Sequence, residues 1–389
     1  MQQLLKIGVA GAGAMGTGIA QVAAMAGHKV VVFDPFDNSL KRSATSLDND
    51  FKKLVEKGKL DQAQAQAVRS NITHAAELNS LAGCSLVIEA AVELLEVKKK
   101  LFADLESVVD AHCILATNTS SLSVISIAAA CQHRGRVIGI HFFNPATIMP
   151  LVEIIPAFTT DDSVAQSAKS LVDSWGKVTV MAKDTPGFIV NRIARPYYGE
   201  AIKMYEEGIA SIADIDHAMR TIGGFRMGPF ELMDLIGNDI NFSVTETVWK
   251  QMFYDPRYRP SITQQRLYEA GLFGRKSGRG YYDYSAGASS PQPTADERKS
   301  IYIFNRILCM LINEAADALY LGIANGDDIE TAMTKGVNYP KGLLKWADEI
   351  GVQKVLEMIQ NLHADYHDDR YRPSLLLKKM VAENRRFFS

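Results

Sequence analysis

A glycine-rich turn near the start of the chain, GAGAMG (Gly11 to Gly16), constrains the fold more than any other feature of the sequence. It follows the short apolar run Leu5–Gly11 and opens Met15–Ala26, in which apolar residues recur at helical spacing. Its three glycines allow a tight turn and close packing of the helix against the strand. A strand, such a turn and a helix are typical of the first unit of a parallel α/β sheet.

Later apolar runs extend this alternation through the first half of the chain. Short runs separated by segments with helical patterns predict parallel strands joined by crossover helices. We therefore expect a doubly wound α/β sheet, interrupted by a helical hairpin over Pro35–Ser70. Further strands are expected at Lys29–Asp34, Cys84–Ala90, Cys113–Ser120 and Arg136–His141.

The second half is predicted to be helical and duplicated. After Lys183–Phe188 the strand pattern ends, and a proline and a glycine mark a domain boundary. The segment that begins at Asn191 recurs from Asn305, and the linker Ser285–Thr294 separates the two copies. We expect a Rossmann-type domain over residues 1–185, followed by two tandem all-α domains. These cover residues 186–284 and, as a degenerate copy, residues 295–389.

Composition narrows the classes of partner. The chain has 389 residues, of which 47% are hydrophobic and 22% charged, and a formal net charge of -2. This balance provides no basic surface for nucleic acid or for an anionic membrane. The apolar run at the start is too short to be a signal sequence or a membrane span, so we expect a cytoplasmic protein. The four cysteines have neither disulfide-framework nor metal-site spacing.

Asp34 lies at the position where a nucleotide-binding site built on such a turn would have an acid. It ends the second expected strand, about twenty residues after the turn, where a carboxylate can accept hydrogen bonds from both hydroxyls of an adenosine ribose. The helix that follows the turn would present its N-terminus to a pyrophosphate. A glycine-rich turn can also be a plain connection, but a strand, a helix and an acid in this order favour a dinucleotide site. Because the carboxylate would repel a 2'-phosphate, we expect NAD rather than NADP.

His141 and Glu153 are ionisable residues in an otherwise apolar stretch. His141 ends an expected strand, and a turn over Asn144–Pro150 followed by the strand Leu151–Ile155 would bring Glu153 back beside it. A carboxylate on one ring nitrogen fixes the tautomer and leaves the other nitrogen as a general base. The alternative is a buried histidine whose ring bonds only to the backbone.

Five motifs, in this order and spacing, resemble the L-3-hydroxyacyl-CoA dehydrogenase family. The resemblance runs from Leu5 to about Tyr284. The helical repeat, WGK at Trp175–Lys177 and NRIARPYY at Asn191–Tyr198 further resemble the 3-hydroxybutyryl-CoA and 3-hydroxyadipyl-CoA dehydrogenases. The resemblance implies NAD-dependent oxidation of a (3S)-3-hydroxyacyl-CoA to the 3-oxoacyl-CoA, and the reverse reaction, in fatty acid metabolism of the β-oxidation type. The five motifs are GAGAMGTGIA, VIEAAVE, TNTSS, GIHFFNP and KDTPGFIVNRI.

The same resemblance assigns roles to individual residues. His141 becomes the general base and Glu153 its orienting partner, while Ser120 bonds the substrate oxygen and Asn191 contacts the substrate carbonyl. Lys57, on the helical insertion, would meet the phosphates of CoA. The implied cofactor contacts are Gly11, Gly13, Met15, Gly16, Asp34, Glu93, Lys98, Asn144 and Lys276.

Several of these residues have a structural alternative. Ser120 and Asn191 could each cap a helix. Glu93 and Lys98 border a run of charges at helical spacing, which is more often a solvated face. Pro150 stands where the family commonly has a lysine, and this leaves the length of the acyl chain open.

Two alternative functions also stand beside the resemblance. One is a dehydrogenase of the same build that acts on a free hydroxy acid or sugar acid, and the other is a non-catalytic, NAD-binding structural protein. For assembly, we expect the two helical copies to pack on each other as an intrachain pseudo-dimer. Further homo-oligomerisation remains open.

Overall fold

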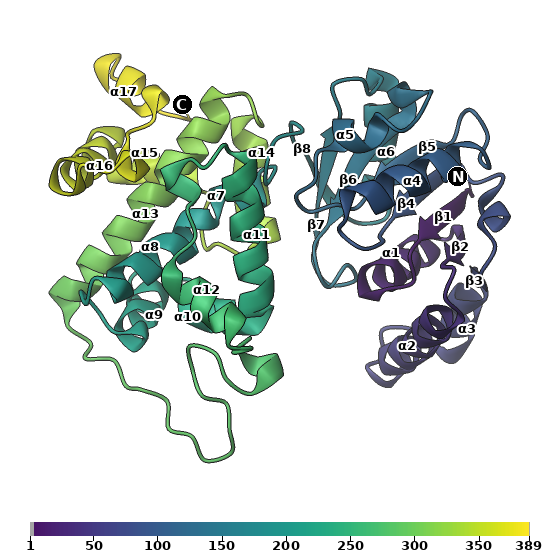
Figure 1. Ribbon diagram of the computed structural model, residues 1–389, viewed down its shortest axis with the longest axis horizontal. Helices are drawn as coiled ribbons and strands as arrows, with labels where there is room; N and C mark the ends of the chain where they lie inside the picture. Colours follow the sequence, from purple (N-terminus) through teal and green to yellow (C-terminus); the bar gives the residue numbers. More distant parts are fainter. Residues whose placement is uncertain (1–3, 389) are drawn as a thin grey trace. The chain divides into compact units, whose positions relative to one another are not determined.

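A computed structural model describes residues 4–388 of the chain (Figure 1). The chain divides between Thr185 and Pro186 into two compact units. The first unit contains a doubly wound sheet and the second is built of helices, so the predicted fold class is confirmed. Within the described part, no helix combines the length and the apolar character that crossing a bilayer would require.

The sheet of the first unit has eight strands among the described residues, in the order β3-β2-β1-β4-β5-β6-β7-β8. Neighbouring strands are parallel except for β6 and β7, which pair antiparallel. The central strands are almost fully buried, as expected where helices cover both faces of a parallel sheet. The strands are β1 Lys6–Ala10, β2 Lys29–Phe33, β3 Ile72–Ala75, β4 Leu86–Glu89, β5 Ile114–Thr117, β6 Val137–Phe142, β7 Leu151–Pro156 and β8 Val178–Met181.

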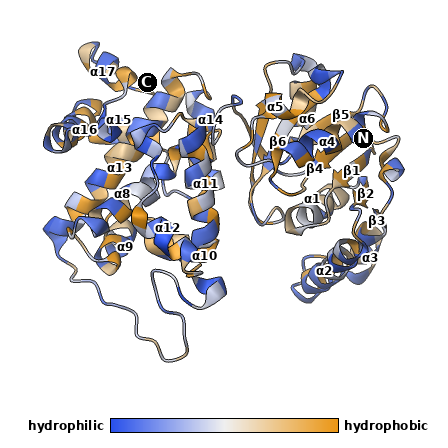
Figure 2. Ribbon diagram, viewed as in Figure 1, coloured by the Kyte–Doolittle hydropathy of each residue, from blue (hydrophilic) through white to orange (hydrophobic). Residues whose placement is uncertain are grey.

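Two hydrophobic clusters cover the two faces of this sheet. On one face, side chains of α1, α2, α3 and α6 pack against the strands, and on the other face those of α4 and α5 do so. The predicted helical hairpin is present as α2 and α3, whose residues are largely polar (Figure 2). The helices of this unit are α1 Ala14–Met25, α2 Asp37–Glu56, α3 Gln62–Ser70, α4 Leu95–Glu106, α5 Val124–Ala128 and α6 Asp162–Ser174.

The sequence did not predict the two edge strands, β3 and β8. Each has only four residues, and each includes at least one exposed side chain. A strand at the edge of a sheet has a neighbour on one side only, and its apolar pattern is correspondingly short. Both were therefore indistinguishable from loop.

The second unit is organised around one long helix, α13, which packs against helices of both copies (Figure 1). The expected linker Ser285–Thr294 is largely exposed and contains no helix or strand. The helices are α7 Val190–Ile193, α8 Arg195–Glu206, α9 Ile212–Thr221, α10 Pro229–Ile236, α11 Asn238–Gln251, α12 Ile262–Glu269, α13 Glu297–Tyr320, α14 Gly326–Gly336, α15 Leu343–Ile350, α16 Val352–Tyr366 and α17 Leu375–Ala382.

The two helical copies differ at their first helix. In the first copy, Pro196 lies at the start of α8 and separates it from the short helix α7. A proline has no N–H group for the helical hydrogen bond, so it tends to break the helix that precedes it. The corresponding residue of the second copy is Met310, and there the helix continues as α13.

The two copies also end differently in sequence but make the same contacts. Asp234 accepts hydrogen bonds from the backbone N–H groups of Tyr281 and Tyr282. In the second copy, Asp348 accepts equivalent bonds from the N–H groups of Phe387 and Phe388. The second copy lacks the GRKSGRGYYDY ending of the first, but another segment takes its place beside the acid.

Candidate active site

The glycine-rich turn joins β1 to α1 and leaves open space at the N-terminus of the helix. Gly11 has φ +121°, and a Cβ there would lie 2.5 Å from the carbonyl oxygen of Ala90. A Cβ on Gly16 would lie 1.9 Å from the carbonyl oxygen of Gly11, so neither position accepts a side chain. A Cβ on Gly13 would meet nothing within 4 Å. The helix N-terminus with this open cradle fits the pyrophosphate of a dinucleotide.

Asp34 lies directly after β2, beside the turn. Its Oδ2 accepts a hydrogen bond of 2.9 Å from the N–H of Ala12, and its Oδ1 accepts one of 3.0 Å from the N–H of Phe36. These bonds hold the carboxylate at the edge of the sheet where open α/β folds bind ligands. Met15 lies in the first turn of α1 and is half-buried. The residues of this edge fit NAD.

His141 and Glu153 are direct partners in the antiparallel pairing of β6 with β7. Residues opposite each other in such a pair point to the same face of the sheet. Nδ1 of His141 lies 2.7 Å from Oε2 of Glu153, and the two residues are 5% and 0% exposed. The predicted pairing is therefore present. A carboxylate at Nδ1 favours the tautomer that carries the proton there, and this leaves Nε2 suited to accept a proton.

Lys98 and Glu93 belong to a buried polar network at the ends of β4 and β5. Nζ of Lys98 lies 2.6 Å from Oε1 of Glu89 and 3.1 Å from Oε2 of Glu93. The Lys98 side chain is 1% exposed, so the solvated-face interpretation is wrong for this residue. Lys98 lies on the buried face of α4, where its charge is balanced by two carboxylates. The sequence did not identify Glu89, although it lies inside the motif VIEAAVE.

Glu93 also fixes the backbone that precedes α5. Its Oε1 accepts hydrogen bonds of 2.5 Å from the hydroxyl of Thr119 and 2.9 Å from the N–H of Ser120. Burial would raise the pKa of Glu93, but Lys98 and these two donors outweigh it and lower the pKa. The residue that caps α5 is Ser123, so the helix-cap alternative for Ser120 is wrong.

Two further residues, absent from the predicted site, hold its strands and helices in place. Asn118 follows β5 and accepts a hydrogen bond of 2.8 Å through Oδ1 from the N–H of Phe142, next to His141. Asp184 accepts bonds of 3.0 and 2.8 Å from the N–H groups of Val124 and Ile125, at the start of α5. Both lie in motifs that carry the family resemblance, TNTSS and KDTPGF, which was the signal that could have identified them.

Asn144 lies exposed in the loop between β6 and β7. Nζ of Lys177 donates hydrogen bonds to the carbonyl oxygens of Ala146 and Met149, at 2.5 and 2.9 Å, and holds this loop. A Cβ on Gly18 would lie 3.2 Å from the Cβ of Ala146, so the loop packs closely on α1. Asn144 and the glycine-rich turn are thereby brought to the same region of the first unit.

The other predicted residues lie elsewhere. Asn191 is inside α7, and the residue at the cap position of that helix is Ile189, so the helix-cap alternative for Asn191 is wrong. Lys276 belongs to the second unit, where its Nζ lies 2.6 Å from Oδ1 of Asp239. Lys57 is exposed immediately after α2.

Comparison with known proteins agrees with this architecture. Residues 6–185 match the family model described as 3-hydroxyacyl-CoA dehydrogenase, NAD binding domain. The model described as 3-hydroxyacyl-CoA dehydrogenase, C-terminal domain, matches twice, at residues 187–284 and 302–386. The two helical copies are therefore both recognisable as that domain.

Similar proteins share most or all of this length. The chain is 36% identical to a 3-hydroxyadipyl-CoA dehydrogenase of Escherichia coli, with 96% of each chain covered. It is 41% identical to a 3-hydroxybutyryl-CoA dehydrogenase of Bradyrhizobium diazoefficiens, over 74% of this chain and 98% of that one. A crystal structure of 3-hydroxybutyryl-CoA dehydrogenase from Escherichia coli superposes with a TM-score of 0.93 at 35% identity, covering 98% of this chain and 99% of that one. The chain belongs to the NAD-dependent 3-hydroxyacyl-CoA dehydrogenases.

Proposed function

We propose that the protein oxidises a (3S)-3-hydroxyacyl-CoA to the 3-oxoacyl-CoA, and catalyses the reverse reaction, with His141 as general base. The observation that carries this proposal is the buried contact of 2.7 Å between His141 and Glu153. It lies in the same unit as a glycine-rich turn and an acid that fit NAD. A buried carboxylate beside an imidazole has a catalytic use because it stabilises the positive charge that appears when the ring takes a proton.

Each residue of the site then has a definite task. His141 accepts the proton of the C3 hydroxyl at Nε2, and Glu153 holds the ring and stabilises its charge. Ser120 donates a hydrogen bond to the substrate oxygen, and Asn191 contacts the substrate carbonyl. Bound NAD supplies the acceptor for the hydride that leaves C3. The contacts proposed for the cofactor are Gly11, Gly13, Met15, Gly16, Asp34, Glu93, Lys98, Asn144 and Lys276.

The substrate is proposed to be a short acyl-CoA thioester. Relatives that match this chain over most of their length are named for a 3-hydroxybutyryl group and for a 3-hydroxyadipyl group, which is two carbons longer and ends in a carboxylate. Lys57, exposed after α2, is proposed to meet the phosphates of CoA. Turnover with acetoacetyl-CoA, with 3-oxoadipyl-CoA and with the corresponding free acids separates the thioester from a free hydroxy acid or sugar acid.

The replacement His141→Gln tests the base directly. It should lower kcat by about 100- to 10,000-fold and leave NADH binding nearly unchanged, because proton transfer is lost while the cofactor contacts remain. Steady-state rates and NADH fluorescence titration measure the two effects. His133→Gln, at an exposed histidine of the same unit, is the matched control and should keep full activity. Near-normal turnover of His141→Gln contradicts the assignment, and a wild-type protein that binds NADH but turns over no acyl-CoA favours the structural alternative.

For assembly, we propose that the two helical copies form a pseudo-dimer within one chain. Glu200 of the first copy accepts hydrogen bonds from Arg306, Arg370 and Tyr371 of the second copy, at 3.1, 3.3 and 3.0 Å. A two-fold interface repeats each contact with the roles of its two halves exchanged, and that is the pattern here. In the reverse direction, Glu314 of the second copy accepts bonds of 2.6, 3.2 and 2.5 Å from Arg192, Arg257 and Tyr258 of the first.

A further inference from the structure

The turn that carries Ser120 is held by side chains rather than by regular backbone pairing. It follows β5 and precedes α5, and four consecutive backbone N–H groups in it donate to side-chain oxygens. The N–H of Thr119 donates a hydrogen bond of 3.2 Å to the hydroxyl of Thr117, and that of Ser120 donates one of 2.9 Å to Oε1 of Glu93. The N–H groups of the next two residues donate to the hydroxyl of Thr119, at 3.3 and 2.9 Å. The shape of the turn therefore depends on where these three side chains are held.

All three side chains connect to Glu89, the last residue of β4, which is 0% exposed. Oε2 of Glu89 accepts a hydrogen bond of 2.7 Å from the hydroxyl of Thr117, and its Oε1 lies 2.6 Å from Nζ of Lys98. Nζ of Lys98 also lies 3.1 Å from Oε2 of Glu93, and Oε1 of Glu93 accepts a bond of 2.5 Å from the hydroxyl of Thr119. Glu89 thus reaches the turn by two routes, one through Thr117 and the other through Lys98 and Glu93.

The charge of Glu89 fixes the direction of the hydrogen bonds in this network. An ionised carboxylate can only accept, so the hydroxyl of Thr117 must donate its proton to Glu89. The oxygen of Thr117 is then left to accept from the N–H of Thr119. Lys98 donates to Glu89 for the same reason, and its positive charge balances one of the two buried acids. A neutral amide in place of Glu89 would remove the charge that orients both routes.

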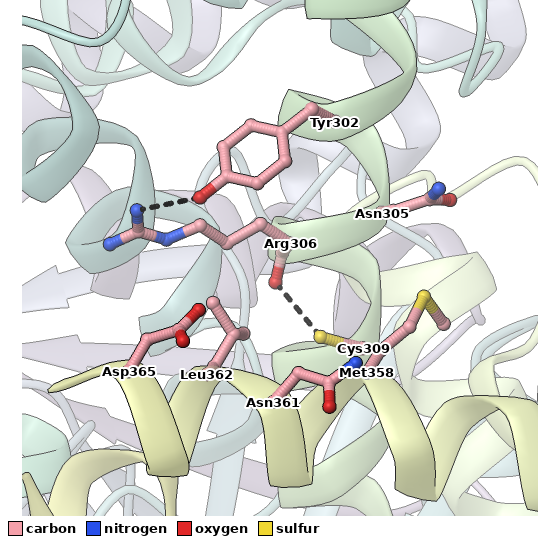
Figure 3. A pocket seen from close by; sticks show the side chains of 8 residues that line it. All are labelled: Tyr302, Asn305, Arg306, Cys309, Met358, Asn361, Leu362 and Asp365. Atoms are coloured by element: carbon pink, nitrogen blue, oxygen red, sulfur yellow. Dashed lines mark hydrogen bonds between the residues drawn. The ribbon is translucent and has the colours of Figure 1, made fainter. Parts of the chain in front are cut away.

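Asn305, the counterpart of Asn191 in the second helical copy, provides a contrast. It lines a pocket of about 210 Å³ between α13 and α16, together with Cys309 (Figure 3). The hydrogen bonds drawn within this lining join Arg306 to the hydroxyl of Tyr302, at 3.5 Å, and the thiol of Cys309 to the carbonyl oxygen of Arg306, at 3.3 Å. Neither includes the side chain of Asn305. A place in the lining of a pocket does not by itself fix a polar side chain, whereas the turn after β5 is fixed by a buried charge.

We propose that Glu89 is a positioning residue for the dehydrogenase reaction, which sets the place of the Ser120 hydroxyl through these two routes. The inference rests on the function proposed above, in which Ser120 donates a hydrogen bond to the substrate oxygen. Glu89 is fully buried and acts through Thr117, Lys98 and Glu93. Placement of this kind matters because an error of about 1 Å at a reacting group can lower the rate by about 100-fold.

A double-mutant cycle with Ser120 tests the proposal. Glu89→Gln keeps the size of the side chain and removes its charge, and it should lower kcat by about 10- to 100-fold. In a protein that already carries Ser120→Ala, the same change should lower kcat by less than about threefold, because the group that Glu89 positions is gone. Glu106→Gln, at the other end of α4, is the matched control. It removes the ion pair of 3.4 Å with Arg136, which is also largely buried, and should keep the wild-type kcat.

Hydrogen exchange measures the position of the turn without reference to turnover. In Glu89→Gln, the amide hydrogens of residues 118–122 should exchange about tenfold faster than in the wild type, and those of β6 should keep their rates. Mass spectrometry of peptides from the full chain measures both. If Glu89→Gln fails to fold, Thr117→Val breaks one route at a side chain of similar shape and should give smaller changes of the same kind.

Three results overturn the proposal. They are unchanged exchange in the turn, a wild-type kcat in Ser120→Ala, and losses of kcat from Glu89→Gln and Ser120→Ala that multiply in full. The last result would mean that Glu89 acts on another part of the site. A wild-type protein that turns over no acyl-CoA overturns the proposed function and the catalytic part of this inference together, and the exchange rates then still decide whether Glu89 holds the turn.

Discussion

In the first helical copy, the carboxylate of Asp216 accepts hydrogen bonds from the N–H groups of Phe230 and Glu231, at the start of α10. In the second copy, Glu330 does the same for Leu344 and Lys345, at the start of α15. The acid has changed length between the two copies. The contact itself is preserved because the first N–H groups of a helix need an acceptor wherever that helix end is buried.

The two copies differ in their first helix and in the residues buried along it. The first copy has Pro196, a separate helix α7 that carries Asn191, and the buried Arg195. The second copy has a continuous helix and Cys309 at the position of Arg195. A duplicated domain thus keeps the contacts that fix its helices, while the break between α7 and α8 and the buried Arg195 are found in the first copy only.

Removal of the second copy is expected to have the largest effect. A chain that ends at Tyr284 would lose every partner of Glu200 named above and would uncover the apolar surface of α8 that packs on α13. It should dimerise or aggregate, because a large exposed apolar patch seeks a partner. Light scattering and thermal unfolding measure this. A soluble, monomeric product as heat-stable as the full chain would show that the copies do not support each other.

Glu200 and Glu314 each accept hydrogen bonds from the other helical copy, and we expect the two acids to contribute equally to the stability of the protein. Glu200→Gln and Glu314→Gln each leave buried arginines without their counter-charge, which should lower the free energy of unfolding by about 3–5 kcal/mol. Urea unfolding measures both. Glu246→Gln, at a more exposed glutamate of α11, should change stability by less than about 1 kcal/mol. If only one of the two buried acids matters, the interface is not the symmetric one proposed.

Asn191 and Asn305 occupy equivalent positions and should differ sharply in their effect on activity. If Asn191 contacts the substrate carbonyl, Asn191→Ala should lower kcat/KM by about 100-fold, the usual effect of removing one such donor. Asn305→Ala, made in the same protein, should leave kcat/KM within about twofold. Equal losses in the two variants would mean that the asparagine serves the helical repeat rather than the reaction.

The effect of Asp216 and Glu330 should be seen as pH dependence. Burial raises the pKa of Asp216 from its ordinary value of 3.8 to about 7, although the Tyr282 hydroxyl and the Phe230 N–H act against this rise, and burial likewise raises the pKa of Glu330. The folded state therefore binds these protons more tightly than the unfolded chain does. The resulting stability is complete below pH 3.8 and is lost as pH rises toward 7.

Replacement by the amide isolates this contribution. Asp216→Asn should have a flatter profile of unfolding free energy between pH 4 and 7 than the wild type, and Glu330→Gln should flatten it less. Denaturant titrations across that range provide the profiles. An Asp216→Asn profile parallel to that of the wild type would contradict a raised pKa at this acid.

The sequence predicted the parts of the fold and of the site that depend on neighbouring residues. The glycine-rich turn, Asp34 and the meeting of His141 with Glu153 follow from strand order and from a short reversal of the chain. The partnership of Lys98 with Glu89 could not be predicted in this way, because it depends on which face of α4 packs on the sheet. The pairing of Arg306 with Glu200 is also decided by tertiary packing, which local periodicity does not record.

The ion pairs between the two helical copies also affect the order in which the protein can fold during its synthesis. Glu200 precedes Arg306 by 106 residues and Arg370 by 170 residues. While the ribosome is still translating the second copy, the nascent first copy contains an acid that has no arginine to meet. Since domains fold as they emerge, the sheet unit can close early, whereas the helical unit must wait for its own later half. The duplication therefore makes completion of the helical unit a late event in translation.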